Sequence, residues 1–186
     1  MRQRTLGLAL ITLGLLGLIG MASAFAARSD HYLVGPGAWA PLTGLGGRPT
    51  CDPPSLSGRT VDVVLSDIGG MMSGGRMMSV AASPSSVPAG EVSFRVWNTG
   101  TMVHELVILP LSPGGAGSRA VGSDGRVNET GSLGEASRTC GEGTGDGIAP
   151  GAASWVTLHL DPGRYELICN LPGHYSMGMF TELEVP

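Results

Sequence analysis

The chain contains no lysine, few aromatic residues and few charges of either sign. All 11 of its basic residues are arginine, charged residues make up 14% of the 186 residues, and aromatic residues make up 5%. The net charge is −4, and no basic cluster follows the first few residues. Because nucleic-acid-binding surfaces are basic, this composition predicts no nucleic acid partner.

A helical hydrophobic period is also missing. The chain has 31 glycines and 13 prolines, which favour turns over helices. Short runs that are rich in β-branched or aromatic residues, and that are bounded by turn residues, predict strands instead. These runs are 60–65, 92–98, 103–109, 155–160, 165–169 and 180–185. The length suits one domain with a good core, so we predict a single all-β domain.

The longest uncharged run, residues 5–27, lies near the N-terminus between Arg4 and Arg28. A basic start followed by an apolar run predicts either a cleaved signal peptide or an uncleaved membrane anchor at residues 1–27. A run of this length is also sufficient to span a bilayer. In both cases we expect an exported domain, secreted or anchored, in the periplasm or on the extracellular face of the cytoplasmic membrane.

Two further segments are dense in turn residues. In residues 28–58, glycine and proline interrupt any period, which predicts an irregular linker before a domain at 59–186. Inside this domain, residues 110–151 are rich in glycine, serine and acidic side chains. A stretch of this length is too long for a plain loop, so we predict an insertion that either has some structure or is a flexible surface excursion.

Only three cysteines are present. Cys51 and Cys140 lie in loop-like sequence, whereas Cys169 ends an apolar strand pattern. The simplest assignment is a Cys51–Cys140 disulfide, with Cys169 kept as a thiolate for other chemistry. The alternative for Cys169 is an inert, buried free cysteine.

The loop after Cys169 combines three metal-binding side chains. Strand alternation places Cys169 on the same side as Leu167, towards the core, and His174 and Met179 follow within ten residues. Two histidines and one cysteine in a trigonal plane, with a distant methionine, form the type 1 copper set. Zinc fits this set less well because thioether is a poor zinc ligand.

A type 1 site requires a second histidine from elsewhere in the chain. His104 stands at the head of a predicted strand, directly after a turn that contains glycine. Of the other histidines, His31 lies in the predicted linker, and His159 points outward by strand alternation. We therefore select His104 and expect His31 and His159 to be solvated.

These motifs resemble the cupredoxin family of type 1 (blue) copper proteins, whose members are plastocyanin-, azurin-, auracyanin- and sulfocyanin-like. The matching motifs are Asn98-x5-His104, Pro162-Gly163-x-Tyr165-x3-Cys169 and Cys169-x4-His174-x4-Met179. The resemblance covers roughly residues 60–185 without the insertion, and it implies a Greek-key β-sandwich. It also implies one type 1 copper per chain, with the ligands His104, Cys169, His174 and Met179.

Within this resemblance, the spacing favours Met179 over Met177 as the axial ligand, and we expect Met177 on the surface beside His174. Glu105 departs from the pattern, since plastocyanin and azurin carry asparagine after the first histidine. Its backbone N–H still has the position to donate to the cysteine sulfur.

The resemblance implies a one-electron carrier whose redox partner proteins dock near His174, with possible membrane association through residues 5–27. We expect no enzyme activity, because only His31 and His159 remain for a second copper centre. The alternative function is a membrane-tethered copper carrier or storage protein that uses a methionine-rich segment. The methionines of this segment are Met71, Met72, Met77 and Met78.

Overall fold

The computed structural model describes residues 51–68 and 78–186. The segment predicted as signal peptide or anchor, most of the predicted linker, and Met71, Met72 and Met77 lie outside the described residues. In the described part, the chain contains no α-helix, and thus no helix long and apolar enough to cross a membrane.

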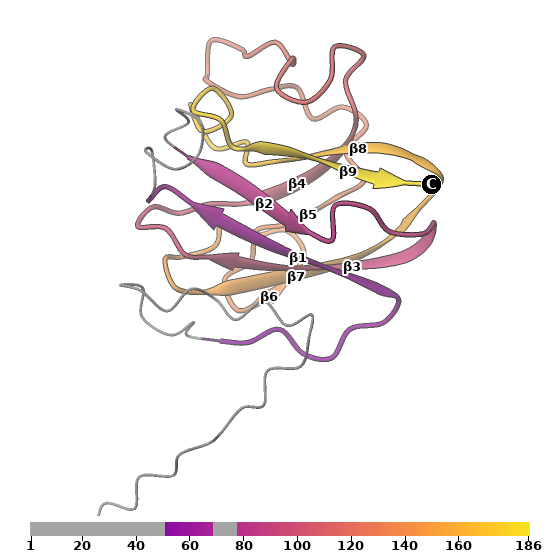
Figure 1. The fold of residues 1–186 in the computed structure, drawn as a ribbon. Coiled ribbons are helices and arrows are strands. Elements are labelled where there is room, and N and C mark those ends of the chain that lie inside the picture. Colours follow the sequence, from indigo (N-terminus) through magenta and orange to yellow (C-terminus); the bar gives the residue numbers. More distant parts are fainter. Residues whose placement is uncertain (1–50, 69–77) are drawn as a thin grey trace, which may run out of the picture. The chain divides into compact units, whose positions relative to one another are not determined.

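Two β-sheets make up the described chain (Figure 1). The five-stranded sheet has the order β2 (Ser79–Ser83), β1 (Arg59–Ser66), β3 (Gly90–Asn98), β7 (Ala153–Leu160) and β6 (Gly141–Glu142). The four-stranded sheet has the order β5 (Gly134–Ala136), β4 (Leu106–Pro110), β8 (Gly163–Ile168) and β9 (Phe180–Val185). Neighbouring strands are antiparallel except for β1–β3 and β6–β7. The predicted all-β sandwich is confirmed.

The main core lies between the two sheets, and β3 shows how the sequence builds it. Val92, Phe94 and Val96 are buried, whereas Glu91 is exposed and Arg95 is half-buried. This alternation is the predicted one, because successive side chains of a strand point to opposite faces. It positions a single apolar face of the five-stranded sheet against the other sheet.

The turn before β8 fixes where that strand begins. The hydroxyl of Tyr165 donates a hydrogen bond to the carbonyl oxygen of Asp161, at 2.7 Å. This contact from a strand tyrosine back to the preceding turn is a tyrosine corner. It anchors the start of the strand that leads to Cys169.

The predicted insertion, residues 110–151, is structured and contains β5 and β6. The loops before β5 lie above the outer face of the four-stranded sheet (Figure 1), whereas β6 pairs with β7 of the five-stranded sheet. A second apolar cluster forms under the loops before β5, separate from the main core, and its buried members are Val107, Leu109, Val127, Ile168 and Tyr175. Gly117 of the insertion, with φ +84°, packs directly against the ring of Phe180. Only glycine fits there, because a Cβ at this position would lie 2.3 Å from that ring.

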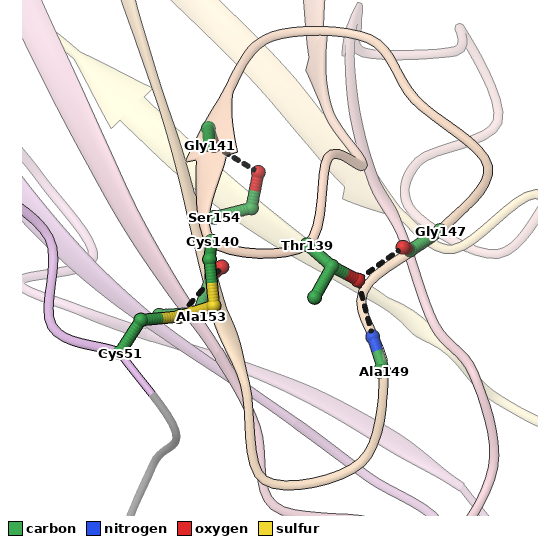
Figure 2. Close-up of a disulfide and its surroundings, with 8 residues drawn as sticks. All are labelled: Cys51, Thr139, Cys140, Gly141, Gly147, Ala149, Ala153 and Ser154. Carbon is green, nitrogen blue, oxygen red and sulfur yellow. Dashed lines mark hydrogen bonds between the residues drawn. A yellow bond between two sulfur atoms is a disulfide. The ribbon is translucent and has the colours of Figure 1, made fainter.

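The Cys51–Cys140 disulfide is present, which confirms the predicted pairing (Figure 2). It joins the segment before β1 to the insertion, and the N–H of Cys140 donates to the carbonyl of Ala153 on β7 at 2.8 Å. Cys169 is a free, buried thiol. Met78, the described member of the methionine-rich segment, is buried in the main core.

Candidate metal centre

His104 lies between β3 and β4, in a short segment that the insertion supports. Its backbone pairs with Ile148 in both directions, with N–H to carbonyl distances of 3.2 and 2.7 Å. The side-chain amide of Asn98 donates to the carbonyls of Met102 and Ile148, each at 2.7 Å, and its oxygen accepts from Gly100 N–H. Asn98 therefore ties the turn before His104 to the insertion.

Cys169, His174 and Met179 lie on one loop between β8 and β9. The N–H of Cys169 donates to the carbonyl of Met179 at 3.0 Å, and the N–H of Met179 donates to the carbonyl of His174 at 3.2 Å. Gly178 adopts φ +102°, a conformation that favours glycine, and this lets the chain turn back before Met179. The loop is thus closed on itself by its own backbone.

The structure brings His104, Cys169 and His174 together. Their ligand atoms all lie within 4.8 Å of one another, and in the described part of the chain no other group of three His, Cys, Asp or Glu side chains does so. The two Nδ1 atoms are 3.2 Å apart, and Cys169 Sγ lies 3.3 Å from Nδ1 of His174 and 3.9 Å from Nδ1 of His104. The geometry fits one metal ion between two nitrogens and one sulfur.

The two methionines of the loop differ in burial. Met179 is fully buried, whereas Met177 is 40% exposed. The exposed position expected for Met177 is confirmed. Met179 is held to Cys169 and His174 by backbone hydrogen bonds, which suits a thioether close to the site, and His159 lies away from it with an exposed side chain.

Burial sets the protonation of the donor atoms. It lowers the pKa of His104 to about 4, with a further contribution from His174, so the imidazole is neutral near pH 7 and offers a lone pair. Burial also raises the pKa of the Cys169 thiol to about 12. A thiolate at this position therefore needs a cation beside it, which a bound metal provides.

The surroundings of the three side chains orient them for a metal. Nε2 of His104 is buried without a hydrogen bond and faces Oδ1 of Asp67 at 3.9 Å. A carboxylate on this side favours the proton on Nε2 and leaves Nδ1 free as a ligand. The N–H of Glu105 donates to Cys169 Sγ at 3.4 Å, as expected from its position in the motif. Soft sulfur with two imidazoles fits copper.

Glu105 has a carboxyl group where the resemblance leads one to expect an amide. The carboxyl is buried, its Oε1 accepts no hydrogen bond from the described residues, and Arg126 Nη1 lies 3.8 Å away. Burial raises the pKa of Glu105 to about 7, and the nearby Glu135 adds to the shift. Sequence reasoning missed Arg126 and Asp67, because neither belongs to a motif and only the folded chain brings them to the site.

A β-sandwich with a buried site of two histidines and one cysteine at one end defines a cupredoxin. The family model for the sulfocyanin (SoxE) domain matches residues 73–186. The chain belongs to this family, which confirms the resemblance seen in the motifs.

The solved structures that the chain matches include rusticyanin and auracyanin. Reduced rusticyanin is 24% identical, with 70% of this chain and 82% of that chain covered and a TM-score of 0.45. Auracyanin from the photosynthetic bacterium Roseiflexus castenholzii is 19% identical, with 69% of this chain and 99% of that chain covered and a TM-score of 0.44. No match was found among curated protein sequences.

Proposed function

We propose that the chain is a one-electron carrier that holds one type 1 copper through His104, Cys169, His174 and Met179. The observation that carries the proposal is the buried cluster of two imidazoles and one thiol, whose ligand atoms lie within 4.8 Å of one another. Membership of the sulfocyanin family supports it. When bound, copper supplies a Cu(I)/Cu(II) couple at this position.

The protein contributes a site that stays the same in both oxidation states. Cys169 receives a hydrogen bond from Glu105 N–H, and His104 is fixed by its pairing with Ile148. A low-polarity cover favours the less charged, reduced state, because burial penalises charge. The packed sheets on both sides leave little room for the ligands to move when the charge changes.

His174 is the ligand through which we propose that electrons leave, since it is 5% exposed while His104 and Cys169 are fully buried. The two loops that carry the histidines also expose apolar side chains, namely Met102, Val103, Pro172 and Met177. A small apolar surface suits a weak, short-lived redox encounter. We therefore propose that redox partner proteins dock over His174.

We further propose that the domain is exported and either secreted or anchored to the cytoplasmic membrane. The support is the uncharged run at residues 5–27. Cell fractionation and the intact mass of the isolated protein test this: a shortened soluble chain indicates cleavage, and a full-length chain in the membrane fraction indicates an anchor. A full-length chain in the cytosol contradicts export.

Copper titration of the purified metal-free protein tests the copper assignment. We expect an intense thiolate-to-copper visible band that saturates at one copper per chain and disappears on reduction. Cys169→Ser removes the band entirely, and Met179→Leu shifts the reduction potential, whereas the matched variant Met177→Leu leaves both unchanged. A wild-type protein that binds copper without this band contradicts a type 1 site.

A further inference from the structure

We infer that residues 117–127 of the insertion, here called the supporting segment, position the copper-ligand loop and hold it in its metal-binding conformation before copper arrives. The inference rests on the proposed function for the identity of the metal. The supporting segment meets the loop at three places, and each place adjoins a proposed ligand.

The first contact lies beside His174. The carboxylate of Glu166 on β8 is fully buried and accepts hydrogen bonds from Gly117 N–H at 2.7 Å, Arg119 Nε at 2.6 Å and the Tyr175 hydroxyl at 2.8 Å. The Tyr175 hydroxyl in turn accepts from Arg119 N–H at 3.1 Å. Tyr175 directly follows His174, so this network fixes the backbone on one side of that ligand.

The second contact lies beside Cys169. Asn170 is buried, and its side-chain amide pairs with the backbone of Val127 in both directions, at 2.7 and 3.0 Å. It also donates to Glu129 Oε1 at 2.6 Å. Arg126 Nη1 donates to the carbonyl of Asn170 at 2.9 Å. Asn170 directly follows Cys169, and its two hydrogen bonds with Val127 join it to the supporting segment as a β-bridge would.

The third contact is a close backbone approach. Gly173 N–H donates to the carbonyl of Gly125 at 2.9 Å. Gly125 adopts φ +77°, and a Cβ at this position would lie 2.9 Å from the nitrogen of Gly173. Only glycine permits this approach, and it fixes the residue that immediately precedes His174.

These contacts do more than cover apolar surface. The polar groups named in these three contacts are paired between the supporting segment and the rest of the site, and buried pairs of this kind specify a single arrangement of the parts they join. Arg126 also reaches the segment that carries His104, because its Nη1 lies 3.8 Å from Oε1 of the adjacent Glu105. The loop amides should therefore be protected from exchange even without a metal.

Hydrogen exchange of the metal-free protein, together with spectra of the copper form, tests the inference. We compare wild type with Asn170→Ala and the milder Tyr175→Phe, and use Ser118→Ala as the matched control. The Ser118 hydroxyl lies in the same segment, but among the described residues it bonds only to Ser112 and Gly115. We expect amides 173–179 to exchange at least about tenfold faster in both test variants, because Tyr175→Phe removes two hydrogen bonds and Asn170→Ala removes three.

In the copper form, the test variants should change the relative intensity of the visible bands and the copper hyperfine coupling, while the control matches wild type. Unchanged exchange and unchanged spectra in Tyr175→Phe overturn the inference, even if Asn170→Ala fails to fold. The exchange measurement needs no copper, and the wild-type spectrum alone tests the proposed function. Failure of one is therefore distinguishable from failure of the other.

Discussion

The outer faces of the two sheets differ in burial. On the five-stranded sheet, Arg95 and Asp62 form an ion pair at 2.6 Å whose side chains are 38% and 27% exposed. On the four-stranded sheet, the insertion buries the equivalent face, and Glu166 pairs with Arg119 while fully buried. Cys169 follows β8 of this doubly covered sheet. The insertion therefore covers the outer face of the sheet whose strand β8 leads to the proposed ligand Cys169.

The two ion pairs offer the strongest test of this difference. Glu166→Gln removes a fully buried carboxylate and leaves Arg119, whose side chain is 17% exposed, without its counter-charge, so we expect a loss of about 3 kcal/mol in the free energy of unfolding. Asp62→Asn breaks a partly exposed pair, and we expect a loss of about 0.2–1 kcal/mol. Urea unfolding of the metal-free proteins measures both. Equal losses would mean that the insertion does not shield the face it covers.

The disulfide stabilises the uncovered sheet by a covalent route. Cys51 and Cys140 close a long loop, with a sequence separation of 89, next to β7. Replacing both cysteines by serine should cost about 2–5 kcal/mol, because the unfolded chain regains conformational freedom. Chemical unfolding measures the loss. The copper band should persist, since the hydrogen bonds between Ile148 and His104 do not involve the cysteines; loss of the band would contradict this separation.

Apolar packing gives a smaller contrast between the two faces. Val127→Ala removes two methyl groups from the second apolar cluster, and we expect a loss of about 2 kcal/mol from transfer and cavity effects. Val64→Ala, on the half-buried outer face of β1, should cost about half as much. Thermal unfolding of the two variants provides the comparison. A larger loss for Val64→Ala would contradict the view that the outer face covered by the insertion is the better packed one.

The last comparison concerns the pH dependence of the metal-free protein. Burial raises the pKa of Glu105 from its usual 4.5 to about 7, so between these pH values the folded state holds a proton that the unfolded state has lost. Wild-type stability therefore falls relative to Glu105→Gln as pH rises from about 4.5 to 7, and the difference is constant outside that window. Unfolding curves at several pH values measure it. A wild type that gains on the variant with rising pH contradicts the assignment.

Much of this architecture is readable from the sequence because the strands of the main core alternate. The burial of Val92, Phe94 and Val96 follows from period-two patterning. The motifs also led to His104, Cys169 and His174, which the fold brings together. Short strands such as β5 and β6 carry too few residues for a period, and β4 starts late because residues 103–105 serve the site.

The second apolar cluster was not predictable in the same way. Ile168 and Glu166 lie on the side of β8 opposite Tyr165, as alternation predicts, but both are fully buried. The insertion, which is rich in glycine and serine, covers them. Its composition alone does not distinguish a structured insertion from a flexible surface excursion. Its order depends on long-range pairs, such as Asn170 with Val127, and no local pattern encodes such a pair.

The complete burial of Cys169 has a consequence for covalent chemistry. Three cysteines permit three different single disulfides, and two of these would consume the thiol that the proposed copper site needs. Exchange between thiols and disulfides requires a thiolate that can reach a sulfur atom. Cys169 is fully buried and its thiol holds its proton well above neutral pH, so the folded protein keeps it out of disulfide shuffling. The same packing that shapes the metal site thereby preserves the Cys51–Cys140 pairing.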